Sequence, residues 1–570
     1  TVINNTQKQI RKFNQDFNIE QINFDDQKVF DMLSSGKTVG LFQIESAGMR
    51  EALIQMKPNH IEDIIALVAL YRPGPMSNIP TYNDCKNGKQ TPDYLHPLLE
   101  EILKPTYGVI IYQEQVMQIA QKLSGFTAGQ ADILRRAMGK KKRAELEKQK
   151  QNFINGAVKN GINKEVAAGI FLKIEPFAEY GFNKSHAAAY GIISYQTAFL
   201  KTYYPKEFIA ASMTMDISNQ NKLSEFYEEL KRLKIEILRP DINECFADFK
   251  TNGDKFYYAL GAIKAVGYEA ISNIVKERIQ NGKFKSIIDF LNRINPKDIN
   301  KLQLEGLVKA GAFDNLNSNR KSLFNSIPNF ITKSKNIFEN KLNNQIDLFG
   351  ENENQVSEII SDIDDWKFEE RLSKEFEAVG FFISDHPLNQ FKDFFDEYNI
   401  VDYHNFISNL DLNVSNIAGT LLKIQERKTA KGNSYAVLKL TDLNNVFELF
   451  IFSDILVANR EILKEGSSLF LTLSKSISNN ENRLTRINVQ KIVSLKNLFN
   501  KPVSEVLFRI KSKDQIEKLS KILSKEGETK VSIELKNEKN TLIFKLENPR
   551  KIDRKSLNLL KNEDIFSNII

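Results

Sequence analysis

The densest group of side chains that can do chemistry is a cationic cluster between residues 135 and 143. Six of these nine residues are cationic, namely Arg135, Arg136, Lys140, Lys141, Lys142 and Arg143. Adjacent guanidinium groups provide paired N–H donors and ammonium groups add point charges, which together suit a triphosphate. Thr127 and Gln130 form a capping-box pattern that predicts a helix beginning near residue 128. The alternative interpretation is a solvated basic helix face.

A second segment, residues 180–190, combines polar, aromatic and small residues. Asn183 and Lys184 supply hydrogen-bond donors, and His186 and Tyr190 provide rings that can stack on a nucleobase. The alanines between the two rings permit a close approach to the backbone. A lone histidine is more often structural than catalytic, so a structural role for His186 is the alternative.

Two short segments have the pattern of helix-hairpin-helix elements, in which a glycine-bearing turn presents backbone N–H groups to a phosphate. The first spans residues 261–274 and the second spans residues 307–313. They supply four candidate DNA contacts: Lys264, Gly267, Lys309 and Gly311. Two copies so close together predict binding to duplex DNA without recognition of its sequence.

Short β-like runs occur at residues 436–440, 447–452 and 469–473, with a helical segment expected at about 453–463. This pattern predicts a small OB-like barrel. Four cations near its first hairpin suit the phosphate backbone of a single strand: Lys423, Arg427, Lys428 and Lys431. OB folds also bind other ligands, so the pattern leaves the ligand open.

A docking peptide is predicted in a polar stretch, residues 326–360, that we interpret as a linker. Gln345 begins the sequence Gln-Ile-Asp-Leu-Phe, and the apolar pair Leu348 and Phe349 can anchor to a partner protein. The alternative is a chance apolar pair at the end of a linker.

The sequence offers no convincing metal site. Paired carboxylates occur at Asp25–Asp26 and within residues 362–365, and we interpret both groups as structural or solvated because neither follows a predicted strand. The five histidines are scattered, and the two cysteines have no CxxC partner, so neither zinc nor a disulfide framework is indicated. The cysteine usage predicts a cytoplasmic protein, and no apolar run is long enough to span a membrane.

Length and charge predict several domains and a polyanion-facing surface. The chain has 570 residues, too many for one hydrophobic core, and a formal net charge of +7. Residues 351–400 carry fourteen acidic and four basic side chains, so the rest of the chain is more basic than the total. Proteins that bind no nucleic acid can have the same charge pattern. The charge alone therefore does not decide whether this chain binds a nucleic acid.

The elements expected to position these residues define a multidomain α+β fold. Apolar spacings of three and four residues predict a largely helical region over residues 1–235, with a buried strand at 109–111. Short helices follow in 236–325, and the linker with an acidic helical segment occupies 326–410. The OB-like barrel is expected at 411–497 and a small α/β domain at 498–570.

Several longer motifs resemble a single family. They are Phe42–Ser46, Tyr71–Pro75, Tyr112–Met117, Arg135–Lys142 and Tyr180–His186. Their order is similar to that in the alpha subunit of bacterial DNA polymerase III, the C-family replicase. The resemblance implies that residues 1–235 are a fingers domain that binds deoxynucleoside triphosphates (dNTPs). It also implies that Gln345–Phe349 binds the beta sliding clamp and that the tail meets the clamp loader's tau subunit.

The implied activity is template-directed 5′–3′ DNA synthesis on primer–template DNA, with contacts to single-stranded template and, in the full-length protein, to a proofreading exonuclease subunit. Two Mg²⁺ ions would support attack of the primer 3′-hydroxyl on the α-phosphate of the dNTP. In this family the metals are bound by three palm aspartates, which we expect upstream of Thr1, so this chain alone is expected to be inactive. The alternatives are a non-catalytic DNA-binding or repair scaffold, and a nuclease that uses residues 362–365.

Overall fold

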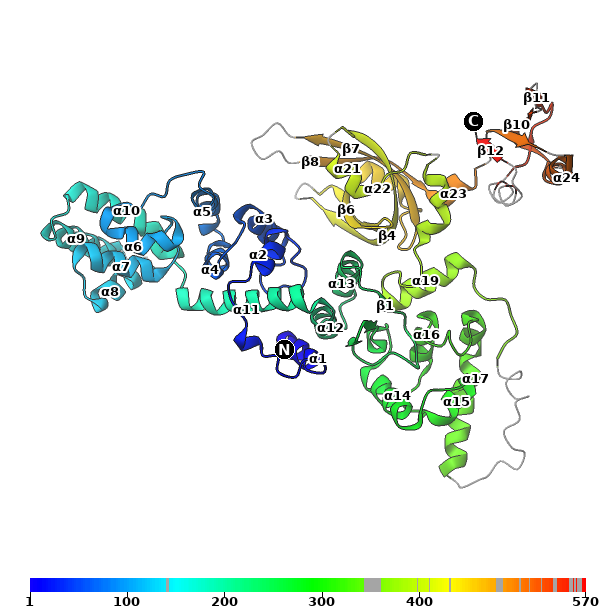
Figure 1. Cartoon of the computed structure of the whole chain (residues 1–570), viewed down its shortest axis with the longest axis horizontal. Coiled ribbons are helices and arrows are strands. Elements are labelled where there is room, and N and C mark those ends of the chain that lie inside the picture. The colour runs from blue at the N-terminus through cyan, green and yellow to red at the C-terminus, as the bar shows by residue number, and fades with distance from the viewer. Residues whose placement is uncertain are drawn as a thin grey trace. The chain divides into compact units, whose positions relative to one another are not determined.

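The computed structural model describes residues 1–139, 143–342, 360–396, 398–409, 411–429, 432–477, 485–501, 504–511, 513–523, 525–536, 541–552, 557, 560 and 566–569. The chain divides into two compact units (Figure 1). Unit 1 comprises Thr1–Leu307, Gly311–Ser318 and Ile327–Ile359. Unit 2 comprises Val308–Ala310, Asn319–Ser326 and Ile360–Ile570. Among the described residues, no helix is both long and apolar enough to cross a membrane.

The N-terminal part of unit 1 is helical, as predicted. Its elements are α1 (Val2–Ile10), η1 (Ile19–Gln21), α2 (Gln27–Ser34), α3 (Ala47–Met56), α4 (Ile61–Leu70), η2 (Pro75–Asn78) and α5 (Ile79–Lys86). The apolar helix α4 is buried from Asp63 to Leu70. Such a helix must lie inside the unit, because it has no polar face to present to water.

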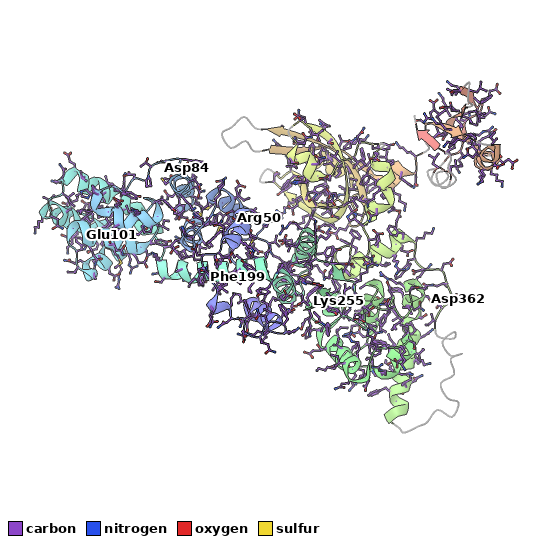
Figure 2. All side chains as sticks on the ribbon, viewed as in Figure 1. Arg50, Asp84, Glu101, Phe199, Lys255 and Asp362 are labelled. Atoms are coloured by element: carbon purple, nitrogen blue, oxygen red, sulfur yellow. The ribbon has the colours of Figure 1, made fainter. Side chains whose placement is uncertain are left out.

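The 20-residue helix α11 (Lys184–Tyr203) runs beside α2 and α4 in Figure 1 and carries Phe199, which Figure 2 labels. Gly191 permits this packing, because a Cβ atom there would lie 2.7 Å from Cγ1 of Ile65 on α4. The helices α12 (Pro205–Met215) and α13 (Gln220–Arg232) follow.

A separate group of helices in unit 1 surrounds its own core. The elements are η3 (Pro97–Leu99), α6 (Glu100–Leu103), η4 (Lys104–Thr106), α7 (Gln113–Ser124), α8 (Ala128–Gly139), α9 (Arg143–Lys159) and α10 (Lys164–Tyr180). Leu123, Leu134 and Phe153 are fully buried in this core. The predicted capping box of α8 is confirmed: the amide of Thr127 donates to Gln130 Oε1 at 2.8 Å, and the amide of Gln130 donates to Thr127 Oγ1 at 3.3 Å.

The apolar run 109–111 is buried, as predicted, but the prediction of a strand is wrong. In the described part of the chain, the single β-bridge at this run joins Tyr112 to Phe182. The amides of Ile111 and Tyr112 donate instead to Oε1 of Gln115, at 2.8 and 3.0 Å. The side chain of Gln115 thus provides the hydrogen-bond acceptor that the carbonyl groups of a neighbouring strand would otherwise provide.

The next part of the chain, which lies mostly in unit 1, contains a small sheet and several helices. The elements are β1 (Ile237–Leu238), β2 (Lys250–Asn252), β3 (Lys255–Tyr257), η5 (Leu260–Ala262), α14 (Tyr268–Asn281), α15 (Ile287–Arg293), α16 (Lys301–Lys309) and α17 (Arg320–Leu342). The sheet order is β1-β3-β2, with β1 parallel and β2 antiparallel to β3.

The expected linker does not begin at residue 326, because α17 continues as a helix to Leu342. Leu323, Ile327 and Phe330 are buried, and their spacing of four and three residues marks one face of a helix. The abundance of Asn, Ser and Lys hid this apolar face. Residues 343–359 lie outside the described residues.

Unit 2 begins with the helical elements α19 (Phe368–Val379), η7 (Pro387–Phe391), α20 (Lys392–Phe395) and α21 (Tyr403–Ser408). A five-stranded antiparallel sheet follows, formed by β4 (Val414–Lys428), β5 (Ser434–Thr441), β6 (Val446–Phe452), β7 (Ser468–Ile477) and β8 (Thr485–Ser494). Its order is β6-β5-β4-β7-β8, and helix α22 (Ser453–Asn459) separates the third strand from the fourth. The predicted strands and helix are therefore confirmed.

The C-terminal part of unit 2 combines helix and strand, as predicted. It contains α23 (Leu495–Phe499), β9 (Glu505–Ile510), α24 (Lys513–Ile522), β10 (Glu526–Lys536), β11 (Thr541–Lys545) and β12 (Phe566–Ile569). The sheet order is β11-β10-β9-β12. Strands β9 and β10 are parallel and are connected through α24, which is the expected crossover for a parallel pair.

Candidate functional site

The two arginines of the cationic cluster share one carboxylate on α8. Asp132 Oδ1 accepts hydrogen bonds from Nε and Nη2 of Arg135 at 3.0 and 2.7 Å, and Oδ2 lies 2.8 Å from Nε of Arg136. The side chain of Arg135 is 30% exposed, whereas that of Arg136 is 64% exposed. The hydrogen bond from Arg135 is the first cause that lowers the pKa of Asp132. Arg136 therefore presents most of its guanidinium to solvent.

The first turn of α7 connects this arginine pair to the start of α11. Gln113 Oε1 accepts from Nη1 of Arg135 at 3.3 Å, while Nε2 of Gln113 donates to the carbonyl of Gly181 at 3.0 Å. The next residue, Glu114, accepts from Nδ2 of Asn183 at 2.8 Å and from the amide of Lys184 at 3.0 Å. Two adjacent residues thus position the segment 181–184 relative to α8.

Asn183, which the sequence predicts as a donor to a nucleotide, caps a helix in the structure. It is the N-cap of α11, and its Oδ1 accepts from the amide of His186 at 2.8 Å. This bond satisfies a helix-start N–H group that has no partner within the helix. Lys184 is exposed, and its ammonium lies 5.5 Å from the ring centroid of Tyr112. Burial raises the pKa of Tyr112 well above its usual range.

A row of rings continues from this turn along α11. The ring centroids of Phe182 and His186 are 5.2 Å apart, those of His186 and Tyr190 are 4.5 Å apart, and those of Tyr190 and Phe42 are 5.5 Å apart. His186 is exposed and Tyr190 is half-buried. At the other end, the guanidinium carbon of Arg72 lies 4.2 Å from the Phe182 centroid, and burial lowers the pKa of Arg72. His186 is the exposed ring of this row, so a planar ligand can contact the row there.

The structure thus links Arg135 and Arg136 to Asn183, Lys184, His186 and Tyr190, all of which are predicted site residues. Lys140, Lys141 and Lys142 lie outside the described residues. Five further residues complete the arrangement. Phe42, Arg72, Gln113 and Phe182 lie in the motifs that carry the resemblance but were given no site role, and Asp132 was overlooked. Asp132 precedes the arginines by three and four residues, which places it on the same helix face, so the spacing alone indicated its role.

The first predicted hairpin is exposed. Lys264 and Gly267 both face solvent, and Gly267 is the N-cap of α14. Ala265 between them has φ +63°, a left-handed conformation that turns the chain sharply without a glycine. Helix α16 supports the loop, because a Cβ atom on Gly306 would lie 2.8 Å from the carbonyl oxygen of Lys264. Gly267 at the start of α14 is therefore exposed, and the side-chain amide of Gln303 lies beside it: a Cβ atom on Gly267 would be 3.1 Å from Nε2 of Gln303.

The second predicted hairpin is less accessible. Gly311 is buried, with φ +82°, and follows the end of α16. The ammonium of Lys309 lies 3.1 Å from Glu377 Oε2, and the Lys309 side chain is 20% exposed. The geometry therefore favours the first hairpin as a DNA contact.

The outer face of β4, β5 and β6 carries both cations and rings. Arg427 is paired in register with Tyr435, and Tyr435 with Phe452, while Lys423 is paired with Lys439. Phe450 and Phe452 are each 52% exposed, because alternate side chains of β6 point away from the core. Lys428 is exposed at the end of β4, and Lys431 lies outside the described residues. The sequence prediction included the cations and overlooked the rings.

Neither group of paired carboxylates has the geometry of a metal site. Asp26 caps α2 by accepting from the amides of Lys28 and Val29. Asp365 accepts from the amide of Lys321 at 3.0 Å and from Nη1 of Arg371 at 2.7 Å. Among the described residues, no three His, Cys, Asp or Glu side chains lie close enough together to hold a metal ion. The clamp-motif residues Gln345, Leu348 and Phe349 lie outside the described residues.

Comparison with known families identifies two regions. The finger domain of the bacterial DNA polymerase III alpha subunit matches residues 1–161, and a helix-hairpin-helix motif matches residues 234–323. The chain is similar to the alpha subunit of bacterial DNA polymerase III. This finding confirms the resemblance seen in the sequence motifs.

Curated relatives are similar over most of the chain. The DNA polymerase III subunit alpha of Rickettsia bellii is 42% identical over 528 residues, which cover 85% of this chain and 44% of the relative. The corresponding subunit of Caulobacter vibrioides is 40% identical over 85% of the chain and 42% of the relative. That of Escherichia coli is 39% identical over 80% of the chain and 40% of the relative. The chain therefore spans less than half the length of these relatives.

Proposed function

We propose that this chain is the nucleotide-binding and DNA-binding part of a replicative DNA polymerase alpha subunit. In the complete protein it would take part in template-directed 5′–3′ DNA synthesis from dNTPs. The observation that carries this proposal is that Gln113 bonds both Arg135 on α8, which shares Asp132 with Arg136, and the carbonyl of Gly181 in the turn before the rings of α11. Cations and stacking rings held by one framework suit a nucleoside triphosphate, which has a polyanion at one end and a planar base at the other.

The residues take distinct roles in this proposal. Arg136 and Arg135, with Lys140, Lys141 and Lys142, bind the phosphates. His186 and Tyr190 lie along the side of the base, and Asn183 and Lys184 hold the turn between the two groups. Holding the triphosphate in one orientation lowers the entropic barrier to reaction with a primer end.

Mg²⁺ is the expected cofactor of the complete enzyme, where it supplies electrostatic stabilisation of the reacting phosphate. The two carboxylate groups considered above do not fit that role, since Asp26 caps a helix and Asp365 pairs with Arg371. We therefore derive no step through the metal, and we propose that the 570-residue chain alone binds substrates without extending a primer.

The remaining regions are proposed to bind DNA and partner proteins. Lys264 and Gly267 contact the duplex backbone, and Lys309 and Gly311 contribute less. Residues 411–497 form an OB fold that binds single-stranded template through Lys423, Arg427, Lys428 and Lys431. The strand order β6-β5-β4-β7-β8 with an intervening helix supports this fold.

The proposed partners follow from the family relationship. Gln345, Leu348 and Phe349 bind the beta sliding clamp, residues 498–570 contact the tau subunit, and the full-length protein binds a proofreading exonuclease subunit. The proposed domain limits are 1–235 for the fingers, 236–325 for the hairpin region and 326–410 for the segment that contains the clamp motif. The proposed location is the cytoplasm.

Calorimetric titration of the 570-residue chain with dATP tests the central proposal. We expect binding that Arg136→Gln weakens about tenfold or more, because the residue loses a charge-assisted contact. Arg460→Gln is the matched control, since Arg460 is 63% exposed and pairs with Glu426 in unit 2. Equal affinity of both variants and the wild type would reject a triphosphate site on α8.

Binding, cleavage and primer-extension assays together separate the proposal from its alternatives. A non-catalytic repair scaffold would bind primed DNA but not dATP, whereas the proposed chain binds both. A nuclease would cleave DNA in the presence of Mg²⁺ and lose this activity on Asp364→Ala. Efficient primer extension by the purified chain would refute the proposed inactivity.

A further inference from the structure

Asp132 occupies the space between the two arginines that are proposed to bind phosphate. Its two oxygens accept from three guanidinium nitrogens at 2.7 to 3.0 Å. A phosphate oxygen would use the same donors. We propose that Asp132 is a positioning residue that holds Arg135 in place and competes with a bound polyphosphate for Arg136. This inference rests on the proposed nucleotide site.

The two arginines are held to different extents. Arg135 uses all three of its nitrogens, two toward Asp132 and one toward Gln113, and its side chain is 30% exposed. Arg136 makes one ion pair with the described residues, from Nε to Asp132. Its side chain is 64% exposed. Exposed ion pairs contribute little stability, so Arg136 can leave Asp132 for a ligand while Arg135 stays.

The carboxylate also reduces the positive charge of the site. Two arginines and one aspartate carry a net charge of +1, whereas the arginines alone would carry +2. The pKa of Asp132 is lowered by Arg135, so the carboxylate remains charged at neutral pH. A polyphosphate must therefore displace a like charge, which weakens its binding and speeds its release.

Replacement of Asp132 by Asn tests this competition with inorganic tripolyphosphate as the probe. Asn is nearly isosteric, retains one acceptor and removes the charge. We expect Asp132→Asn to bind tripolyphosphate about three- to tenfold more tightly than the wild type at low salt, as the Coulomb energy of one exposed charge implies. The gain should shrink at high ionic strength and should appear mainly as slower release in stopped-flow displacement.

Two comparisons distinguish competition from a general change in charge or fold. Asp254→Asn makes the same charge change at an exposed pair with Lys206, at 3.0 Å, and should leave the affinity unchanged. Asp132→Glu keeps the charge and should keep the wild-type affinity. Because Arg136 is the contested residue, the gain from Asp132→Asn should be clearly smaller when it is combined with Arg136→Gln, where only the through-space charge effect remains.

The outcomes separate this inference from the proposed function. If Arg136→Gln weakens binding but Asp132→Asn binds tripolyphosphate no more tightly than the wild type, the competition is refuted and the phosphate site stands. A gain of equal size in the wild-type and Arg136→Gln backgrounds would refute the competition in the same way. If the wild-type chain does not bind tripolyphosphate and Arg136→Gln changes nothing, the phosphate site and this inference both fail.

Discussion

Replacement of Lys201 by Met removes the cation of a buried ion pair that joins α11 to α13. Nζ lies 2.6 Å from Oε1 of Glu229, and the two side chains are 2% and 4% exposed. The ammonium also donates to the carbonyl groups of Lys37 and Val39, at 2.9 and 2.7 Å. The substitution therefore deprives one buried carboxylate and two carbonyl groups of their donor, beside the helix that carries the ring row.

The expected loss of stability follows from these contacts. Removal of one partner from a buried ion pair typically costs about 3–5 kcal/mol. Glu229 keeps two hydrogen bonds from Arg232, at 2.7 and 2.5 Å, and these bonds limit the loss of stability. We therefore expect about 3 kcal/mol, which lowers the hydrogen-exchange protection of α11 and α13 by about two orders of magnitude.

Hydrogen exchange measured by mass spectrometry is the suitable assay, because the chain has two units and global unfolding need not be two-state. Peptides from unit 2 provide an internal reference. Lys206→Met is the matched control: its pair with Asp254 is exposed, and its loss should cost less than about 1 kcal/mol. If the amides of α11 are as well protected from hydrogen exchange in Lys201→Met as in Lys206→Met, the reasoning is refuted.

Three further predictions concern a helix cap, a close helix contact and the two hairpins. Thr127→Ala removes the N-cap of α8 and should cost about 1 kcal/mol of local stability. Hydrogen exchange of the α8 amides should become faster, and unchanged exchange would contradict this prediction. Gly191→Ala should lower the melting temperature through a clash worth about 1–3 kcal/mol, whereas Gly129→Ala, with no atom within 4 Å of its Cβ position, should not lower it. Lys264→Glu should weaken duplex binding and reduce its salt slope, whereas Lys309→Met should leave both nearly unchanged; equal effects in anisotropy titrations would contradict this difference.

Features with a local physical cause were predictable from the sequence. The start of α8 follows from Thr127 and Gln130, whose side chains and amides pair within four residues. The strands β5, β6 and β7 follow from short β-branched and aromatic runs. In each case the residues that decide the structure are neighbours in the sequence.

Other features were missed, some because a nearby side chain was overlooked and some because the partners lie far apart in the sequence. The apolar run 109–111 predicts a strand, although Gln115, three and four residues from Tyr112 and Ile111, supplies the acceptor for both of their amides. The helix α17 was hidden because its polar residues outnumber the buried face formed by Leu323, Ile327 and Phe330. For the site, residue type identified the arginines, but the role of Gln113 depends on partners 22 and 68 residues away.

The geometry of the arginine pair also argues against treating its two members as equivalent. Each nitrogen of Arg135 donates one hydrogen bond to the protein, so a ligand can use the second N–H groups of Nη1 and Nη2 while the bonds to Asp132 and Gln113 hold the side chain in place. Those bonds fix α8 to the turn that begins α11, so weakening them would also move the rings. Arg136 has no such second attachment among the described residues. A site that keeps one arginine fixed and leaves its neighbour mobile can bind a polyphosphate and release it without rearranging its framework.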